Sequence, residues 1–576
     1  MTRFQHPSAV GVVARHAPNL WDGLAFSLIF GVIILISHGG SETLVPISAL
    51  DQYPVSLDPE MLPEYALRTT LRMLAAMAAS VAFTLLYGAL AAKSRRAEMV
   101  LIPILDILQS VPILGFLSFT VVGFMAMFPG QVIGVELAAI FAIFTSQAWN
   151  MAFSFYQSLK TVPHDLEEAS QAFHLSSWQR FWRLEVPFAM PGLVWNAMMS
   201  MSGGWFFVVA SEAISVGNVT YTLPGIGSYV ALAIQQSDLA AVGWAVGAML
   251  VVILLYDQIL FRPLVAWADR FRVELSAGAT APKSWLLDAM RRGRLLRIVL
   301  APVGAALAWT ARQRFEAPVP QAARAALGRR WADWAWIAIV LAVTAYALVS
   351  IARFVATELA WSDLAHVAWL GSLTLVRVLV LIALASLIWV PIGVWIGLRP
   401  RVAERVQPLA QFLAAFPANI VFPFAVVLIV RFGLDPDIWL SPLMVLGTQW
   451  YILFNVIAGA SVFPNDLKEA AATFHVGGWN WWRKVILPGI FPYYVTGAIT
   501  ASGGSWNASI VAEVASWGST TLKAQGIGSY IADATTAGDY PRIVLGVAVM
   551  SAYVLLFNRL LWRPMYVLAA RRTRLD

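Results

Sequence analysis

Twelve long apolar segments follow one another along this chain, and they limit its possible folds more than any other feature. A helix needs about 20 apolar residues to cross a bilayer, so each segment is a candidate membrane-spanning helix. The candidates form two sets of six: 21–38, 65–92, 99–128, 132–157, 188–214 and 240–262, then 331–356, 368–398, 405–432, 438–461, 488–513 and 541–562. The sequence therefore predicts an all-α polytopic membrane protein.

The composition excludes the soluble classes of protein. Hydrophobic residues make up 59% of the 576 residues and charged residues 12%, against roughly 45–50% and about 25% in soluble domains. A cytosolic enzyme, a nucleic-acid-binding protein or a disordered scaffold needs more polar surface than this chain can supply. The absence of cysteine excludes disulfides and thiolate-held metal sites.

Basic residues follow the even-numbered segments, which sets the expected orientation. They are Lys93, Arg95 and Arg96, then Arg180 and Arg183, Arg262, Arg270 and Arg272, Arg399, Arg401 and Arg405, Lys468, Arg483 and Lys484, and Arg563, Arg571 and Arg572. Acidic residues instead crowd the loop after the first segment. We therefore expect both termini in the cytoplasm. The first segment is longer than a signal-peptide core, so we interpret it as a retained span.

The second half of the sequence repeats the first. Pro163-His-Asp-Leu-Glu-Glu-Ala recurs 301 residues later as Pro464-Asn-Asp-Leu-Lys-Glu-Ala, and Gly-Ile-Gly-Ser-Tyr occurs at both 225–229 and 526–530. Because each half holds an even number of spans, the two repeats share one orientation about an axis along the membrane normal.

The repeat divides the chain into three parts. We expect a first repeat over 1–262, a connector over 263–330 and a second repeat over 331–576. The connector is rich in arginine and then briefly apolar, which favours a helix on the anionic inner leaflet over a short re-entrant segment.

The loop between the fourth and fifth segments, and its copy between the tenth and eleventh, is the most informative part. In each copy an Asp precedes a Glu by three residues (Asp165 and Glu168, Asp466 and Glu469), which predicts a capping box at the start of a short helix. A break and a second short amphipathic turn would complete a helix–turn–helix elbow beneath the membrane.

Two such elbows suit two equivalent grooves of a dimeric cytoplasmic partner. The alternative is that they only join spans. The residues expected to contact the partner are Asp165, Glu168, Ala169, His174 and Trp178, with Asp466, Glu469, Ala470, Ala471, His475 and Trp479 in the copy.

These loops resemble a known family. Glu469-Ala-Ala471 followed by Ile486-Leu487-Pro488 is similar to the Glu-Ala-Ala loop of binding-protein-dependent ABC importer permeases. The first copy matches the family pattern less closely. Both copies carry a histidine, His174 or His475, where the family pattern has glycine, so Gly477-Gly478 is expected to supply the bend in the second copy. The Gly-Ile-Gly-Ser-Tyr segments and Thr-Leu-Val-Arg377 look most like the nitrate, sulfonate and taurine branch, in a fused and duplicated form.

The resemblance implies a type I ABC importer permease in a bacterial inner membrane. Its two halves would form one pathway for a small anion such as nitrate, a sulfonate, taurine or bicarbonate. The elbows would act as coupling helices on two ATPase subunits, and an extracytoplasmic binding protein would deliver the substrate. The chain has no Gly-Lys dipeptide and hence no P-loop, so ATP and Mg are expected on a separate subunit, and this chain is expected to be neither an enzyme nor a cofactor carrier.

Two other classes compete with this interpretation. An ion-coupled secondary transporter can also have duplicated halves, but it needs no cytoplasmic elbows. A purely structural membrane subunit of a larger complex would leave transport unaffected by substitutions in a cavity.

Charged residues inside spans are candidates for the pathway. Arg72 and Arg377 each lie about two helical turns into a span, and a matched pair of arginines would favour an anion. Alternatively, each arginine pairs with a carboxylate or extends to the membrane interface. Glu212 and Glu513 lie near the outer ends of their spans, and pairing with the arginines is their favoured interpretation.

Weaker candidates follow the two Ser-Gly-Gly triplets. Trp205 stands directly after the first triplet, and Trp506 and Asn507 come shortly after the second. These three are tentative cavity residues, whereas the triplets suit close helix packing. His174 and His475 have no second ligand at helical spacing, so no metal site is predicted.

Overall fold

The computed structural model describes residues 54–110, 113–216, 219–271, 284–292, 294–314, 326–356, 358–461 and 465–572, with residues 23, 46 and 463. The expected first span, 21–38, lies outside the described residues apart from residue 23.

The first half is helical with one short hairpin. Its elements are α4 (Leu62–Lys93), α5 (Arg95–Ser110), α6 (Ile113–Met127), α7 (Val132–Lys160), α8 (His164–Ala172), α9 (Ser177–Arg180), α10 (Val186–Ser211), β1 (Ala213–Val216), β2 (Val219–Thr222), α11 (Ile226–Gln235), α12 (Leu239–Tyr256) and α13 (Arg262–Ala268). The strands are antiparallel, with Ala213 opposite Thr222.

Three shorter helices replace α7 in the second half, which otherwise has the same order of elements. They are α17 (Trp361–Gly397), α18 (Pro400–Ala415), α19 (Phe422–Phe432), α20 (Pro436–Trp439), α21 (Leu443–Leu446), α22 (Trp450–Ser461), α23 (Asn465–Thr473), α24 (Gly478–Trp481), α25 (Leu487–Ala512), β3 (Val514–Trp517), β4 (Thr520–Lys523), α26 (Ile527–Ala537), α27 (Tyr540–Phe557) and α28 (Arg563–Arg572). The connector holds α14 (Trp285–Arg292) and α15 (Arg294–Arg312), and α16 (Ala326–Ala356) begins at its end and forms the first span of the second half.

Four turns of π-helix occur at matched places in the two halves. Phe181–Glu185 precedes α10 and Trp482–Ile486 precedes α25, while Asp257–Phe261 follows α12 and Asn558–Trp562 follows α27. Since π-turns are rare and cluster at functional sites, their repetition indicates that both halves keep the same irregular helical turns beside the elbows and after α12 and α27.

Eight helices in the described part of the chain are long and apolar enough to cross a membrane, or nine if one bent pair counts as a span. The expected twelve are therefore not confirmed. The expected span 99–128 is divided between α5 and α6, and 405–432 between α18 and α19. The expected span 438–461 is bent by 43° between Pro436–Leu446 and Gln449–Ser461.

Proline explains why these segments break although their composition is apolar. Pro112 stands between α5 and α6 in the sequence, and Pro417 follows α18 with an extended backbone (φ −69°, ψ 104°). Proline removes a backbone donor and disfavours helix in the residue before it, so an apolar run alone overestimates helix length.

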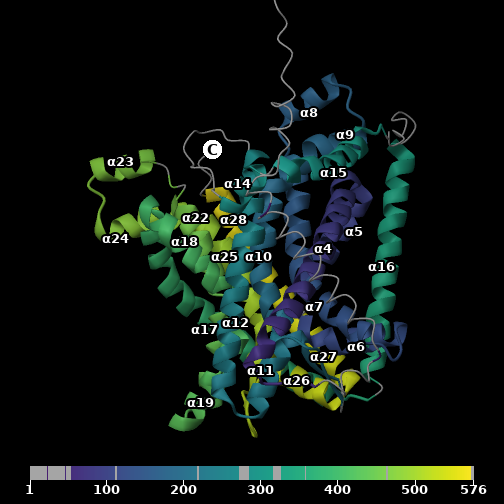
Figure 1. Ribbon diagram of the computed structural model, residues 1–576, viewed down its shortest axis with the longest axis vertical. Helices are drawn as coiled ribbons and strands as arrows, with labels where there is room; N and C mark the ends of the chain where they lie inside the picture. Colours follow the sequence, from purple (N-terminus) through teal and green to yellow (C-terminus); the bar gives the residue numbers. More distant parts are fainter. Residues whose placement is uncertain are drawn as a thin grey trace, which may run out of the picture.

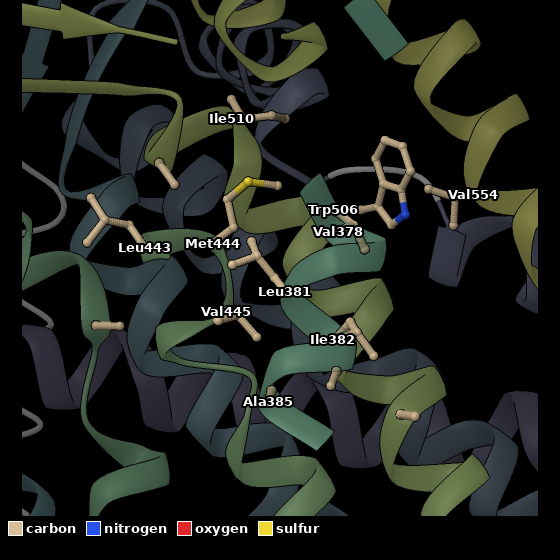
Figure 2. Packing of buried hydrophobic residues seen from close by; sticks show 14 of the residues in the cluster. Val378, Leu381, Ile382, Ala385, Leu443, Met444, Val445, Trp506, Ile510 and Val554 are labelled. Atoms are coloured by element: carbon tan, nitrogen blue, oxygen red, sulfur yellow. The ribbon is translucent and has the colours of Figure 1, made fainter. Parts of the chain in front are cut away.

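The two halves pack against each other through equivalent pairs of helices. In the first half α12 contacts α18 of the second, and correspondingly α27 contacts α5. The largest hydrophobic core also draws on both halves, with Ile113 and Phe207 from the first. Figure 2 shows part of it, where Val378, Met444, Trp506 and Val554 converge from α17, α21, α25 and α27. One structural unit therefore joins both repeats.

Helices other than the long spanning ones lie at the two ends of the bundle (Figure 1). The short helices α8, α9, α23 and α24 lie at one end, together with α14, α15 and α28, while α11, α19 and α26 lie at the opposite end.

Candidate functional site

A cavity of about 230 Å³ lies where the two halves meet. It is lined from α5, α7 and α10 on one side and from α18, α22, α25 and α27 on the other. None of the described lining residues is Asp, Glu, Lys, Arg or His. Its polar lining consists of neutral hydroxyl and amide groups, among them Gln109, Thr145, Asn150, Thr448, Asn507 and Asn558.

Equivalent positions of the two repeats face this cavity. Asn150 on α7 and Tyr451 on α22 both line it and stand 301 residues apart. The wall is closed by bonds between the halves: Ser202 Oγ lies 3.0 Å from Tyr451 Oη, and the Ile113 N–H donates to Asn507 Oδ1 at 2.8 Å. The cavity therefore belongs to both repeats and to neither alone.

The Ser-Gly-Gly triplets combine packing with an open cavity. Gly203 and Gly503 line the cavity, and a side chain added at Gly503 would meet nothing within 4 Å. Gly204 instead faces a neighbouring helix, because an added Cβ would lie 2.6 Å from the Gln147 amide nitrogen. Close packing, which the sequence predicted for the triplets, is therefore only one of their two roles.

Of the tentative pathway residues, only Asn507 lines the central cavity. Trp205 lines a second, more apolar cavity of about 390 Å³ between α10, α12 and α18, and Trp506 is buried in the core. The other cavity-lining hydroxyl and amide groups were missed because neutral polar residues in an apolar helix give no distinctive sequence signal.

Arg72 is the centre of a buried charge cluster away from the cavity. Its Nε and Nη2 contact both carboxylate oxygens of Glu136 at 2.6 and 2.7 Å, and its Nη1 contacts Glu212 Oε1 at 2.7 Å. The same Nη1 donates to the Pro224 carbonyl at 2.9 Å. This geometry matches the pairing alternative, and the interpretation that Arg72 faces the pathway is not supported.

Arg377 has the corresponding partners in the second half. It lies 3.3 Å from Glu513 and 2.9 Å from Asp437, and donates to the Gln525 carbonyl at 2.7 Å. It too is paired and does not line the cavity. The Asp437 side chain is 41% exposed, whereas that of Glu136 is only 8% exposed, so the second cluster is the wetter one.

Glu136 and Asp437 were missed by the sequence analysis. They stand 301 residues apart, the offset of the whole repeat, so a search for acidic residues at that spacing would have found them.

The clusters explain the Gly-Ile-Gly-Ser-Tyr segments. In the first half Thr69 Oγ1 donates to Glu212 at 2.7 Å and accepts from the Ile226 N–H at 3.0 Å, while the Gly227 N–H donates to Glu212 Oε2 at 2.6 Å. In the second half Thr374 makes the same bonds to Glu513 and the N–H of Ile527. Each segment is thus held against a buried carboxylate by its own backbone.

Alanine at the second glycine of either segment is expected to destabilise the protein. A Cβ at Gly227 would lie 2.3 Å from the Val209 carbonyl oxygen, and one at Gly528 would lie 2.5 Å from the Ser509 backbone. Because backbone must then move, we expect Gly227→Ala and Gly528→Ala each to cost about 1–3 kcal/mol, measured as a lower unfolding temperature in detergent. Gly243→Ala is the control, since nothing lies within 4 Å of its Cβ; an equal loss in all three would contradict the packing argument.

The first helix of each elbow begins earlier than the sequence predicts. Helix α8 begins at His164 with Pro163 as its N-cap, so Asp165 is already inside the helix and forms no capping box with Glu168. Helix α23 likewise begins at Asn465, ahead of Asp466. The predicted capping boxes are therefore wrong.

The proline sets this boundary. Pro163 has an extended backbone (φ −57°, ψ 139°), and helix follows at once, so Asp165 lies in the first turn, where its charge favours the helix dipole. A capping box does occur one helix later, between Ser176 and Gln179.

The histidines at the family's glycine position form the turn themselves. His174 and His475 have left-handed backbones, with φ of 49° and 51°. The following N–H groups, of Leu175 and Val476, reach back to the carbonyls of Ser170 and Ala471, which is a Schellman ending. Gly478 is also left-handed (φ 58°), but it adds a second bend at the start of α24 and does not replace the first.

Both elbows expose aromatic side chains. Phe173 is 77% exposed and Phe474 78%, and each stands at the tip of its elbow between the two short helices. Glu168, Ala169, Glu469 and Ala470 are exposed beside them, and Trp479 is 72% exposed. Exposed aromatics repeated in two equivalent places are typical of a surface that binds a partner.

Each elbow is anchored to the bundle in its own way. In the first, Arg180 pairs with Glu167 and Glu185, and Glu185 pairs with Lys93 at the end of α4. In the second, Trp481 packs edge-on against the buried Phe463. The shape of the elbow is repeated although its anchoring chemistry is not.

Comparison with known proteins shows where this architecture belongs. The family described as "Binding-protein-dependent transport system inner membrane component" matches residues 63–266 and again residues 389–574. The bicarbonate transport system permease protein CmpB of Synechococcus elongatus is 29% identical over 201 residues, 35% of this chain and 69% of that protein. The nitrate import permease protein NrtB of Leptolyngbya laminosa is 27% identical over 33% of this chain and 65% of its own length.

A further relative names a different cargo. The glycine betaine/proline betaine transport system permease protein ProW of Escherichia coli is 30% identical over 33% of this chain and 50% of its own length. Each relative thus covers about one repeat. The protein belongs to the family of binding-protein-dependent transport system inner membrane components, as a permease of an ABC transport system in which the family unit occurs twice.

Proposed function

We propose that the two repeats together import a small anion of the bicarbonate, nitrate or sulfonate kind through the cavity between them. The observation that carries this proposal is one cavity shared by two units of a permease family whose relatives include bicarbonate and nitrate permeases. An ion-coupled secondary transporter is not favoured by the same family match.

A neutral lining suits transient binding of a small anion. Amide and hydroxyl N–H and O–H groups of Gln109, Asn150, Thr448 and Asn558 can donate to anion oxygens as water does. A fixed arginine or lysine would hold the anion more tightly, whereas conduction requires that the substrate also leave. The paired arginines Arg72 and Arg377 serve the fold, in this proposal, and not the substrate.

The elbows would transmit ATP-driven motion. Two ATPase subunits would dock on the exposed tips Phe173 and Phe474, with Glu168, Ala169, Trp178 and, in the second elbow, Asp466, Glu469, Ala470, Ala471 and Trp479 around them. The basic residues beside the elbows support a cytoplasmic location for this end and for both termini. An extracytoplasmic binding protein would then meet the opposite end, where α11 and α26 lie (Figure 1).

Asn150→Leu is expected to reduce anion uptake by at least about tenfold, because it replaces an exposed amide in the cavity with an isosteric apolar group. The measurement is uptake of labelled bicarbonate, nitrate and a sulfonate into proteoliposomes holding the purified complex with its ATPase and binding protein. Asn480→Leu, which changes another exposed asparagine outside the cavity, is the matched control for membrane insertion and yield.

Two results would contradict the proposal. ATP-independent uptake by the chain alone would favour a secondary transporter. Uptake of a betaine, but of none of the three anions, would overturn the cargo; the aromatic lining residues Trp149, Phe206 and Phe557 make this a physically reasonable test arm.

A further inference from the structure

The connector helix α15 is attached to the first elbow. It lies across the elbow end of the bundle and packs against α9 (Figure 1). The Trp178 indole N–H donates to the Thr310 carbonyl at 2.8 Å, and the Gln179 side-chain amide donates to the Arg312 carbonyl, also at 2.8 Å. Carbonyls in the last turn of a helix lack partners within the helix, so the elbow supplies the C-terminal cap of α15.

The second elbow has no such cover within the described residues. Trp479 and Asn480 occupy the positions equivalent to Trp178 and Gln179, 301 residues later. Trp479 is 72% exposed and Asn480 is exposed, whereas Trp178 is half-buried and Gln179 is only 6% exposed. The two elbows therefore differ in their contacts with the connector, although their helices and turns match.

The second half of α15 is mostly apolar and exposed. The described residues from 301 to 310 are all exposed, including Trp309 at 64%. Arginines stand at both ends of the helix, at 294 and 297 and at 312 and 314. An apolar helix flanked by arginines and lying across the end of a membrane-spanning bundle has the composition that anionic lipid surfaces bind.

We propose that α15 is bound to the anionic lipid surface and holds the first elbow but not the second, so that membrane charge sets coupling through one elbow only. This inference rests on the proposed coupling role of the elbows. The occupant is the headgroup layer of the membrane that the bundle itself spans, because α15 lies at the level where the spanning helices end (Figure 1).

Binding of α15 to lipid can be tested without any transport assay. The chain has no cysteine, so Ala305→Cys provides a unique site for a polarity-sensitive fluorophore on the exposed face. The full chain is reconstituted in vesicles of phosphatidylcholine, with or without phosphatidylglycerol. We expect a blue-shifted emission only with phosphatidylglycerol, reversed by high salt; Asn480→Cys, on the second elbow, is the control that keeps one emission in both. Identical emission of the Ala305 label in both vesicles would overturn the proposal.

The asymmetry has its own test, on the purified complex with its ATPase. Trp178→Phe keeps an aromatic ring and removes the N–H donor, and Trp479→Phe makes the same change at the equivalent position, which holds no helix in the described part of the chain. Both tryptophans lie in the proposed docking surface, so the ATPase rate itself falls in both variants, and the readout is the ratio of the rates with and without phosphatidylglycerol. We expect this ratio to fall about fivefold in Trp178→Phe, the size expected for one hydrogen bond, and to keep its wild-type value in Trp479→Phe.

The outcomes separate the two proposals. A wild-type complex with no substrate-stimulated ATPase activity would contradict the coupling function, while the fluorescence result for α15 would stand. An equal change of the lipid ratio in both tryptophan variants would overturn the asymmetry while leaving the coupling function intact.

Discussion

Arg72→Leu is expected to destabilise the folded protein by about 3–5 kcal/mol, which is the usual cost of leaving a buried charge without its partner. Glu136 and Glu212 are both buried, so neither carboxylate can turn to water once the guanidinium is gone. The measurement is the unfolding midpoint of the purified chain in mild detergent, together with the yield of monodisperse protein.

The second repeat provides the matched control. Arg377→Leu removes the equivalent arginine, but its partner Asp437 is 41% exposed and can be hydrated, so we expect a clearly smaller loss. Arg72→Lys should also be less stable than the wild type, although it keeps the charge, because an ammonium cannot make the bidentate contact to Glu136. Equal midpoints for Arg72→Leu and Arg377→Leu would contradict the role assigned to burial.

A compensating variant makes the result specific to charge. In the triple variant Arg72→Leu, Glu136→Gln and Glu212→Gln, no uncompensated charge remains, so part of the lost stability should return. If the triple variant is less stable than Arg72→Leu alone, the loss comes from packing of the arginine stem and not from the unpaired carboxylates.

The architecture was largely predictable because its signals are repeated. Apolar segments identify membrane helices by length and composition, and the offset of 301 residues identifies two copies of one unit. The number of spans was not predictable in the same way. An apolar run at 99–128 or 405–432 is equally compatible with one long helix and with two short ones, and the prolines that separate α5 from α6 and α18 from α19 decide the matter locally.

The candidate site was harder to predict, since the residues that stand out in a sequence are not those that line the cavity. Arg72 and Glu212 attract notice because charge inside a membrane is costly, yet that cost is met by their mutual contact. Asn150 and Thr448 line the cavity but resemble many neutral residues of apolar helices. Only their position between the repeats distinguishes them, and position between repeats is a property of packing, not of composition.

The double variant Phe173→Asp and Phe474→Asp is expected to abolish ATP-driven uptake while leaving the permease folded in the membrane. Each phenylalanine is more than three-quarters exposed, so its removal costs the fold little. An aromatic anchor at the centre of an interface is typically worth at least about 2 kcal/mol, or roughly 30-fold in affinity, so losing both should release the ATPase subunits. The measurement is the amount of ATPase subunit that copurifies with the tagged chain.

Phe432→Asp is the matched control for this experiment. Phe432 is 66% exposed at the end of α19, on the side of the bundle opposite the elbows (Figure 1). It should therefore leave copurification unchanged, which separates loss of a docking surface from a general effect of an added charge.

The single variants test whether the two elbows are equivalent. If the elbows bind equivalent ATPase subunits, Phe173→Asp and Phe474→Asp should weaken copurification to similar extents, since both tips have nearly the same exposure. Full copurification of the ATPase with the double variant would show that the elbows only join spans, and coupling would then have to be sought elsewhere on the surface of the chain.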